Sequence, residues 1–274
     1  MKTALTIAGS DSIGGAGIQA DIKTMSALGV YAMSAITAIT AQNTLGVQAV
    51  QPMTPELVAS QIDSVFNDIR PDAVKIGMLC NEGIVRAVAD RLRHHHAEHV
   101  VLDTVILSTS GRELLDENGV RALLDELLPL VDVVTPNIPE AEHLTGLGSI
   151  RGHDDMIAAA KKLACNAAVL VKGGHLADTA DDLLFWNGEC RWYSMERIDV
   201  ANTHGTGCTL SSAIAAGLAL DHDVPEAVER AKKYITEVLK HDPHLGHGNG
   251  PLNHFADLQI CTSSFPMNQT QKNR

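Results

Sequence analysis

LTIAGSDSIGGAGIQADIKT, residues 5–24, contains the clearest indication of the fold class. A short apolar run leads into a glycine-rich turn, and apolar residues at helical spacing follow that turn. We expect a strand at 4–9 and a helix at 17–29. A strand joined to a helix through a tight turn is the repeating unit of an α/β protein.

The same alternation continues along the chain. Strands are predicted at 31–40, 72–77, 99–103, 131–135 and 167–174, and helices at 55–69, 207–220 and 225–240. Such alternation is typical of a mainly parallel central sheet with helices on both faces. No internal repeat or linker divides the chain, so we expect one domain over 1–258 and a polar, flexible tail over 259–274.

Composition favours a small-molecule partner. The 274 residues carry a formal net charge of −12 without a long basic run, so we expect no binding to nucleic acid or to a membrane surface. The N-terminal segment lacks the pattern of a signal peptide, and no apolar run approaches the ~20 residues of a membrane helix. Five scattered cysteines without a CxxC pair are typical of reduced thiols. We therefore expect a cytoplasmic protein.

Polar and glycine-rich segments follow the predicted strands. In parallel sheets, ligands bind beyond the carboxyl ends of the strands. Seven segments are therefore expected to meet at one edge of the sheet: GSDSIGGAG (9–17), AQNT (41–44), GML (77–79), DTV (103–105), TPNIPEAE (135–142), KGGH (172–175) and HGTGC (204–208).

Common nucleotide motifs do not explain the first of these loops. Gly15, Gly17 and Ala20 fit a variant of the dinucleotide fingerprint. However, Gln42 and Asn43 stand where that fingerprint needs an acidic ribose ligand, which argues against a hydride-transfer enzyme. No GxxxxGK[ST] loop is present, so any phosphate must be held in another way.

HGTGC can hold an anion. Gly205 and Gly207, on either side of Thr206, allow backbone amides to surround a negative group at the positive end of the following helix. Cys208 lies in the first turn of that helix, where the dipole predicts a thiol pKa below the usual ~8.5. Cys208 could then accept a proton. The alternative is a small cysteine that fills space beneath the turn.

Oxygen-bearing side chains follow two neighbouring strands. Asp103 ends one strand, and Asn137 and Glu140 belong to a segment in which Pro139 suits the first turn of a helix. Each alone could be an ordinary loop or helix cap. Together they suit hydrated Mg²⁺ that bridges nucleotide phosphates. Lys172 could balance phosphate charge, although lysines at strand ends are commonly just solvated.

Taken in order, the motifs resemble one family. LTIAGSDSIGGAGIQADIKT, ALGVYAMSAITAITAQNT, VKIGML, VTPNIPEAE, VKGGH, THGTGCTLSSAIAAGLA and GPLNH resemble the hydroxymethylpyrimidine/phosphomethylpyrimidine kinases of thiamine biosynthesis, in the ribokinase superfamily. The resemblance spans roughly residues 3–256. It implies a ribokinase-like fold and ATP- and Mg²⁺-dependent phosphorylation of 4-amino-5-hydroxymethyl-2-methylpyrimidine, and then of its monophosphate. It also implies a homodimer.

The resemblance also implies residue roles. The catalytic set is Gly205, Thr206, Gly207 and Cys208; the substrate-binding set is Gly9, Asp21, Gln42, Met78 and Val105; the nucleotide-binding set is Asp103, Asn137, Lys172 and Thr206; the metal ligands are Asp103 and Glu140. Independently of the family, a Gln42 carboxamide can pair with an aminopyrimidine edge through two complementary hydrogen bonds. Met78 and Val105 could equally be plain core residues.

Two segments depart from the family pattern. DSIGGAG replaces DPSGGAG or DSSGGAG, and DTVIL replaces a segment that begins DPVM, so Ile13, Thr104 and Ile106 are expected in loops that flank the site. We expect altered rate or selectivity rather than lost chemistry, because Asp103 is retained. Two other functions remain open at this point: a pyridoxal or pyridoxine kinase, and a non-enzymatic pyrimidine sensor.

Overall fold

The computed structural model describes residues 1–107, 113–174, 181–194, 202 and 204–256, and the tail predicted at 259–274 lies outside them. Within this part of the chain, nine strands form one sheet in the order β3-β2-β1-β4-β5-β6-β7-β8-β9. Six strands run parallel: β1 (Thr3–Asp11), β2 (Tyr31–Asn43), β4 (Ala73–Ile76), β5 (Val100–Leu102), β6 (Val133–Val134) and β7 (Ala168–Val171). These six confirm the strands predicted from the sequence.

The edges of the sheet are antiparallel. β3 (Gly46–Pro52) pairs with β2 at one edge, and β8 (Asp182–Trp186) and β9 (Glu189–Tyr193) form the other. These three strands were not expected from the sequence. The sheet is nevertheless mainly parallel, as expected.

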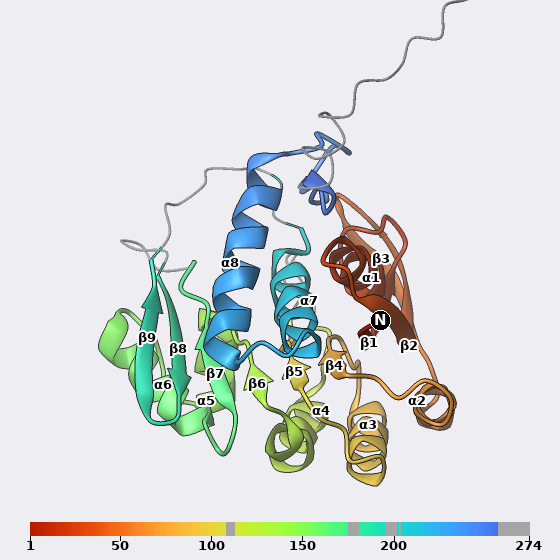
Figure 1. Cartoon of the computed structure of the whole chain (residues 1–274), viewed down its shortest axis with the longest axis horizontal. Coiled ribbons are helices and arrows are strands. Elements are labelled where there is room, and N and C mark those ends of the chain that lie inside the picture. The colour runs from red at the N-terminus through yellow and green to blue at the C-terminus, as the bar shows by residue number, and fades with distance from the viewer. Residues whose placement is uncertain (108–112, 175–180, 195–201, 203, 257–274) are drawn as a thin grey trace, which may run out of the picture.

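Helices cover both faces of the sheet (Figure 1). One face packs against α2 (Pro55–Phe66), α3 (Glu82–His94), α4 (Glu117–Ala122), α5 (Ile138–Thr145) and α6 (His153–Leu163). The other face packs against α1 (Gly17–Ala27), α7 (Thr206–Ala219) and α8 (Val224–Lys240). The α/β architecture with helices on both faces is therefore confirmed.

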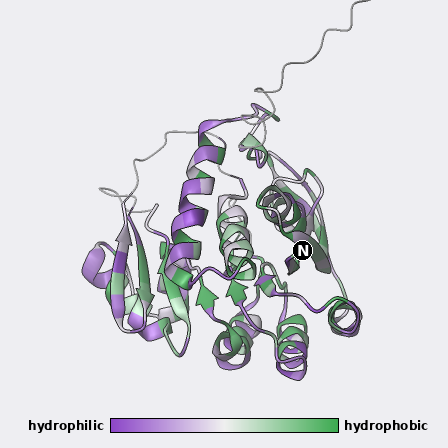
Figure 2. Ribbon diagram, viewed as in Figure 1, coloured by the Kyte–Doolittle hydropathy of each residue, from purple (hydrophilic) through white to green (hydrophobic). Residues whose placement is uncertain are grey.

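α7 is the most deeply buried of these helices. Every residue from Thr209 to Ala219 is buried, and in Figure 2 the ribbon of α7 is pale to green beside α8, whose ribbon is largely hydrophilic. A Cβ atom on Gly217 would lie 2.9 Å from the Cβ of Ala227, so the glycine permits close packing of α7 on α8. This packing fixes α7 against the sheet, with its N-terminus at the edge where the strands end. Within the described residues, no helix is both long and apolar enough to cross a bilayer.

Candidate active site

A pocket lies at the carboxyl ends of the parallel strands. All seven loops expected at this edge contribute to it, which confirms the prediction from strand order. The lining comprises Ala8, Gly9, Ser10, Asp11, Ala16, Gly17, Thr40, Gln42, Val47, Met78, Asp103, Val105, Leu107, Leu114, Asn137, Glu140, Lys172, His204, Gly205, Thr206, Gly207 and Cys208. Of the predicted site residues, Asp21 is the one that the pocket lining does not include.

The start of α7 supplies the expected anion-binding geometry. Gly205 adopts a left-handed conformation with φ +86°, and a Cβ there would lie 1.9 Å from the carbonyl oxygen of Gly15. Only glycine fits this position without moving the first loop. The turn directs the first backbone N–H groups of α7 into the pocket, where helix N-termini stabilise negative charge. A Cβ on Gly207 would lie 3.5 Å from Nζ of Lys172, so the helix start and this ammonium face the same space.

Cys208 lines the pocket, but its thiol is not acidified. Burial raises the pKa of Cys208 to about 11, and the nearby ammonium of Lys75 only partly opposes this effect. The predicted lowering by the helix dipole is therefore wrong. Burial, together with the negative charges of Asp21 and Asp103, penalises the thiolate more than Lys75 and the Gly17 N–H favour it. At neutral pH the side chain is a protonated thiol.

Asp103 and Lys172 form a buried ion pair opposite the helix start. Oδ1 of Asp103 lies 3.1 Å from Nζ of Lys172 and accepts a hydrogen bond from Thr135 Oγ1. Burial alone would raise the pKa of Asp103, but the ammonium groups of Lys172 and Lys75 hold it below its usual value. Lys172 therefore remains a cation in the pocket, as expected, rather than a solvated surface lysine.

Glu140 is held by the beginning of α5. Asn137 and Glu140 form a capping box, in which each side chain accepts a hydrogen bond from the other's backbone N–H at 2.9 Å. Thr104 Oγ1 also donates to Glu140 Oε2 at 2.9 Å. Burial, together with the charge of Asp103, raises the pKa of Glu140 to about 6, although Lys172 opposes the shift. The capping alternative is thus correct for Asn137 and Glu140, and it does not exclude a second role.

The donor set suits Mg²⁺ in the way that nucleotide enzymes use it. Oε2 of Glu140 takes both hydrogen bonds, and no donor in the described part of the chain is bonded to Oε1. Burial raises the pKa of this carboxylate to about 6, and a cation bound at Oε1 would oppose that rise. No cluster of three His, Cys, Asp or Glu ligands exists among the described residues. Mg²⁺ needs no such cluster, since one or two carboxylates together with phosphates and water complete its octahedron.

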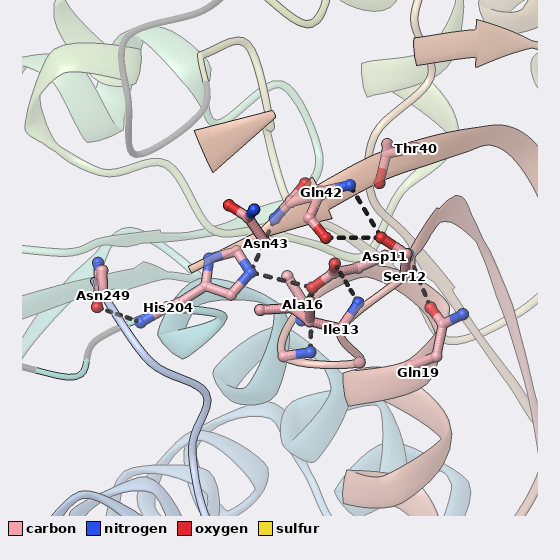
Figure 3. A network of polar contacts seen from close by, with 12 residues as sticks. Asp11, Ser12, Ile13, Ala16, Gln19, Thr40, Gln42, Asn43, His204 and Asn249 are labelled. Atoms are coloured by element: carbon pink, nitrogen blue, oxygen red, sulfur yellow. Dashed lines mark hydrogen bonds and ion pairs between the residues drawn. The ribbon is translucent and has the colours of Figure 1, made fainter. Parts of the chain in front are cut away.

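The opposite wall of the pocket contains Gln42 and two residues that the sequence analysis did not select. Figure 3 shows His204 between Asp11 and Gln42. The Nε2 atom of His204 lies 3.0 Å from Oδ2 of Asp11 and 2.9 Å from the carboxamide nitrogen of Gln42. Asp11 and His204 both belong to quoted loops, GSDS and HGTGC, and that membership was the available signal.

Asp21 lies beneath the pocket rather than in its wall. The side chain is fully buried in α1, where it accepts hydrogen bonds from Thr6 Oγ1 at 2.6 Å and Ser212 Oγ at 2.7 Å and pairs with Lys75. These partners come from β1, α7 and β4, so Asp21 joins three elements to α1. The structure therefore does not bring Asp21 to the substrate position that was expected.

The other expected substrate contacts are in the pocket. Gly9 and Met78 meet across the lining, since a Cβ on Gly9 would lie 3.3 Å from Sδ of Met78. Val105 also lines the pocket. Among the family departures, Thr104 points to Glu140, whereas Ile106 is buried in the core and Ile13 is outside the lining.

This combination defines a class of protein. A parallel sheet with a helix N-terminus, a buried lysine and paired carboxylates at its edge is the arrangement of a small-molecule kinase with a ribokinase-like fold. The sequence profile described as "Phosphomethylpyrimidine kinase" matches residues 11–253. The chain belongs to the phosphomethylpyrimidine kinase family.

Individual relatives agree with this assignment. The chain is 49% identical over 257 residues to a hydroxymethylpyrimidine/phosphomethylpyrimidine kinase from Salmonella typhimurium, covering 92% of this chain and 97% of the relative. A phosphomethylpyrimidine kinase structure from Clostridium difficile superposes with a TM-score of 0.78 at 45% identity, covering 86% of this chain and 99% of that one. An ADP complex of Bacillus subtilis pyridoxal kinase superposes with a TM-score of 0.87 at 37% identity, covering 95% and 99%.

Proposed function

We propose that this protein transfers the γ-phosphoryl group of ATP to 4-amino-5-hydroxymethyl-2-methylpyrimidine and then to the resulting monophosphate. One observation carries the proposal: the Gln42 carboxamide shares a pocket with the α7 N-terminus and Lys172. A carboxamide recognises a neutral aminopyrimidine edge, while backbone N–H groups and an ammonium recognise phosphate. Membership of the kinase family and the likeness to an ADP complex support ATP as the donor.

The residues of the pocket stabilise the charge that develops during transfer. In the first transfer the substrate hydroxyl oxygen forms a bond to the γ-phosphorus, and in the second an oxygen of the monophosphate does so; each time the bond to the β–γ bridging oxygen breaks and ADP leaves. The N–H groups at Gly205–Gly207 and the ammonium of Lys172 would stabilise the negative phosphoryl oxygens. Glu140 and Asp103 would hold Mg²⁺, which neutralises phosphate charge when bound.

Cys208 is the proposed acceptor of the hydroxyl proton. Its place in the first turn of α7 puts the thiol beside the expected site of the transferred group. Because burial raises the pKa of Cys208 to about 11, the accepting form is a minor thiolate that the ammonium of Lys75 favours. A weak or scarce base can suffice, because phosphoryl transfer depends mainly on positioning and charge stabilisation.

Pyridoxal phosphorylation is the second candidate activity, favoured by the TM-score of 0.87 to a pyridoxal kinase. Sequence identity favours the pyrimidine enzymes, with 49% for the Salmonella typhimurium relative against 37% for the Bacillus subtilis enzyme. A coupled assay of ADP release with hydroxymethylpyrimidine, its monophosphate and pyridoxal tests the assignment. We expect turnover with both pyrimidines, and a protein that phosphorylates only pyridoxal would refute the proposed function.

We further propose a single catalytic domain that works as a homodimer in the cytoplasm. On β2 and the turn that follows it, Ile39 and Leu45 expose 52% and 71% of their surface, which suits burial against a second copy. Light scattering should give twice the monomer mass, and Ile39→Lys should lower it. A monomeric wild-type protein would rule out the dimer.

A further inference from the structure

The contact between His204 and Gln42 raises a question of hydrogen-bond polarity. One ring nitrogen, Nε2 of His204, faces both the Asp11 carboxylate and the Gln42 carboxamide. A ring nitrogen either carries a hydrogen and donates it, or carries a lone pair and accepts. The Asp11 contact therefore decides what the Gln42 contact can be.

Asp11 requires a donor. Its carboxylate accepts hydrogen bonds from the backbone N–H groups of Ile13, Gly15 and Ala16 at 2.8–3.1 Å. Burial alone would raise the pKa of Asp11, but the bond from His204 and these backbone bonds hold it below its usual value. An ionised carboxylate offers only acceptor oxygens, so Nε2 of His204 must carry the hydrogen.

The imidazole ring has little freedom to turn away. A Cβ on Gly15 would lie 2.7 Å from Cδ2 of His204 and 3.0 Å from Cβ of Pro251, so the ring is packed against the first loop. The backbone N–H of His204 donates to Oδ1 of Asn249, whose own N–H donates to the Thr44 carbonyl two residues beyond Gln42. The segment around Asn249 thus ties the His204 loop to the end of the Gln42 strand.

A protonated Nε2 cannot accept a hydrogen bond from the amide nitrogen that lies 2.9 Å away. A half-turn of the carboxamide exchanges its oxygen and nitrogen without changing its shape. With the Gln42 oxygen turned to His204, the imidazole N–H is shared between that oxygen and the Asp11 carboxylate. The Gln42 NH₂ group then faces the rest of the pocket.

We propose that His204, fixed as a donor by Asp11, sets the orientation of the Gln42 carboxamide and so selects the hydrogen-bond pattern of the ring that binds. This role deepens the proposed function and rests on it. The Gln42 oxygen then receives a hydrogen from the exocyclic amine of the substrate, and the Gln42 NH₂ donates to the adjacent ring nitrogen. His204 is a positioning residue that acts through Gln42.

A pair of ring compounds tests this orientation. The 4-oxo analogue of hydroxymethylpyrimidine keeps both substituents but reverses the pattern, because it offers an acceptor oxygen beside a ring N–H donor. Against a fixed carboxamide this ring makes two mismatches, so the wild-type protein should bind the 4-amino ring about 100-fold more tightly by calorimetry.

The informative variant is His204→Phe, which keeps a planar ring and removes the donor. Its carboxamide can turn to match either compound, so the amino-to-oxo ratio should fall about 10-fold or more. Ser12→Ala is the matched control, since Ser12 bonds the backbone N–H and carbonyl of Gln42 but not its carboxamide. Ser12→Ala should weaken both compounds equally and leave the ratio unchanged.

Several outcomes would overturn the proposal. An unchanged ratio in His204→Phe would show that Gln42 is oriented without His204, and an equal fall in Ser12→Ala would show that the effect is not specific. A wild-type protein that binds both rings equally would refute the fixed orientation of the carboxamide but not the proposed function. One that binds neither ring refutes the proposed function instead.

A measurement on the wild-type protein covers the case in which His204→Phe fails to fold. With ¹⁵N-labelled histidine, the imidazole resonances distinguish a protonated Nε2 from a ring protonated only at Nδ1, and a His204→Gln spectrum assigns the signal. We expect a hydrogen on Nε2 at pH 7. A His204 ring protonated only at Nδ1 would overturn the proposal whatever the binding data show.

Discussion

The ammonium of Lys75 lies 2.9 Å from each carboxylate oxygen of Asp21, and both side chains are completely buried. Burial alone would lower the pKa of Lys75, but the charge and hydrogen bond of Asp21, together with the charges of Cys208 and Asp103, outweigh burial and raise the pKa. The pair joins β4 to α1 directly beneath the pocket. It also puts a positive charge near Cys208 and Asp103, and this charge acts to lower the pKa of both groups.

Removing one member of this pair should be costly. We expect Lys75→Met to lower the free energy of unfolding by about 3 to 5 kcal/mol, because Asp21 would remain as an uncompensated buried charge. Urea unfolding followed by circular dichroism measures the loss. Lys75→Met combined with Asp21→Leu should restore much of the stability, and a double variant as unstable as the sum of the single variants would contradict an ion-pair explanation.

Gln42→Leu should weaken pyrimidine binding by about 1 to 3 kcal/mol, since polar atoms of the ring would give up water on binding without gaining their partners. Calorimetry with hydroxymethylpyrimidine measures this change. Nucleotide binding serves as the internal control and should stay the same. An unchanged pyrimidine affinity would remove Gln42 from substrate recognition.

Glu140 should give nucleotide binding a pH dependence. Its pKa is raised to about 6, so the carboxylate is ionised above that pH and becomes protonated as pH falls through it. The KM for Mg·ATP should therefore rise below about pH 6. In Glu140→Gln the Mg²⁺ requirement should be higher at every pH and this dependence should vanish, while pyrimidine affinity stays nearly intact. Equal losses for nucleotide and pyrimidine would indicate a structural role.

The hydroxyl of Thr104 should stabilise the ionised form of Glu140 and so lower its pKa. Thr104→Val keeps the shape and removes the 2.9 Å hydrogen bond to Oε2, at a cost of about 1 kcal/mol to the ionised form. We expect a higher Mg²⁺ requirement and a higher apparent pKa in the KM profile for Mg·ATP. Thr104→Ser keeps the donor and should behave like the wild type, and identical profiles for Val and Ser would show that the hydroxyl has no such effect.

Cys208→Ala should lower kcat by about 10²-fold, the usual contribution of a positioned acid or base. Because the thiol pKa is raised to about 11, the wild-type kcat should increase with pH from 7 toward 10. Cys208→Asp should recover part of the activity and lose this alkaline dependence, since a carboxylate is already ionised. A Cys208→Ala enzyme with near-normal kcat would exclude the thiol as the proton acceptor.

Local sequence patterns are sufficient to predict the architecture and the edge at which the site forms. Alternating strand and helix patterns are local, and parallel strands place every following loop on one side, so β1, β2 and the α7 loop could be located without coordinates. The antiparallel strands β3, β8 and β9 escaped prediction. The exposed edge strand β9 mixes charged and aromatic residues and lacks the apolar runs of the buried strands, whereas β8 is short and apolar.

The protonation and the contacts of the site residues depend on packing between segments that are distant in the sequence. A helix start favours a thiolate, but the degree of burial that raises the pKa of Cys208 arises from packing between α7 and the sheet. Asp21 follows a glycine-rich loop, as a substrate-binding residue would, but its position on α1 directs the side chain inward to Lys75. His204 lies 193 residues from Asp11 and 162 from Gln42 in the sequence. Whether His204 donates or accepts a hydrogen bond depends on the polar groups that contact it. A local sequence pattern cannot indicate contacts between residues so far apart in the chain.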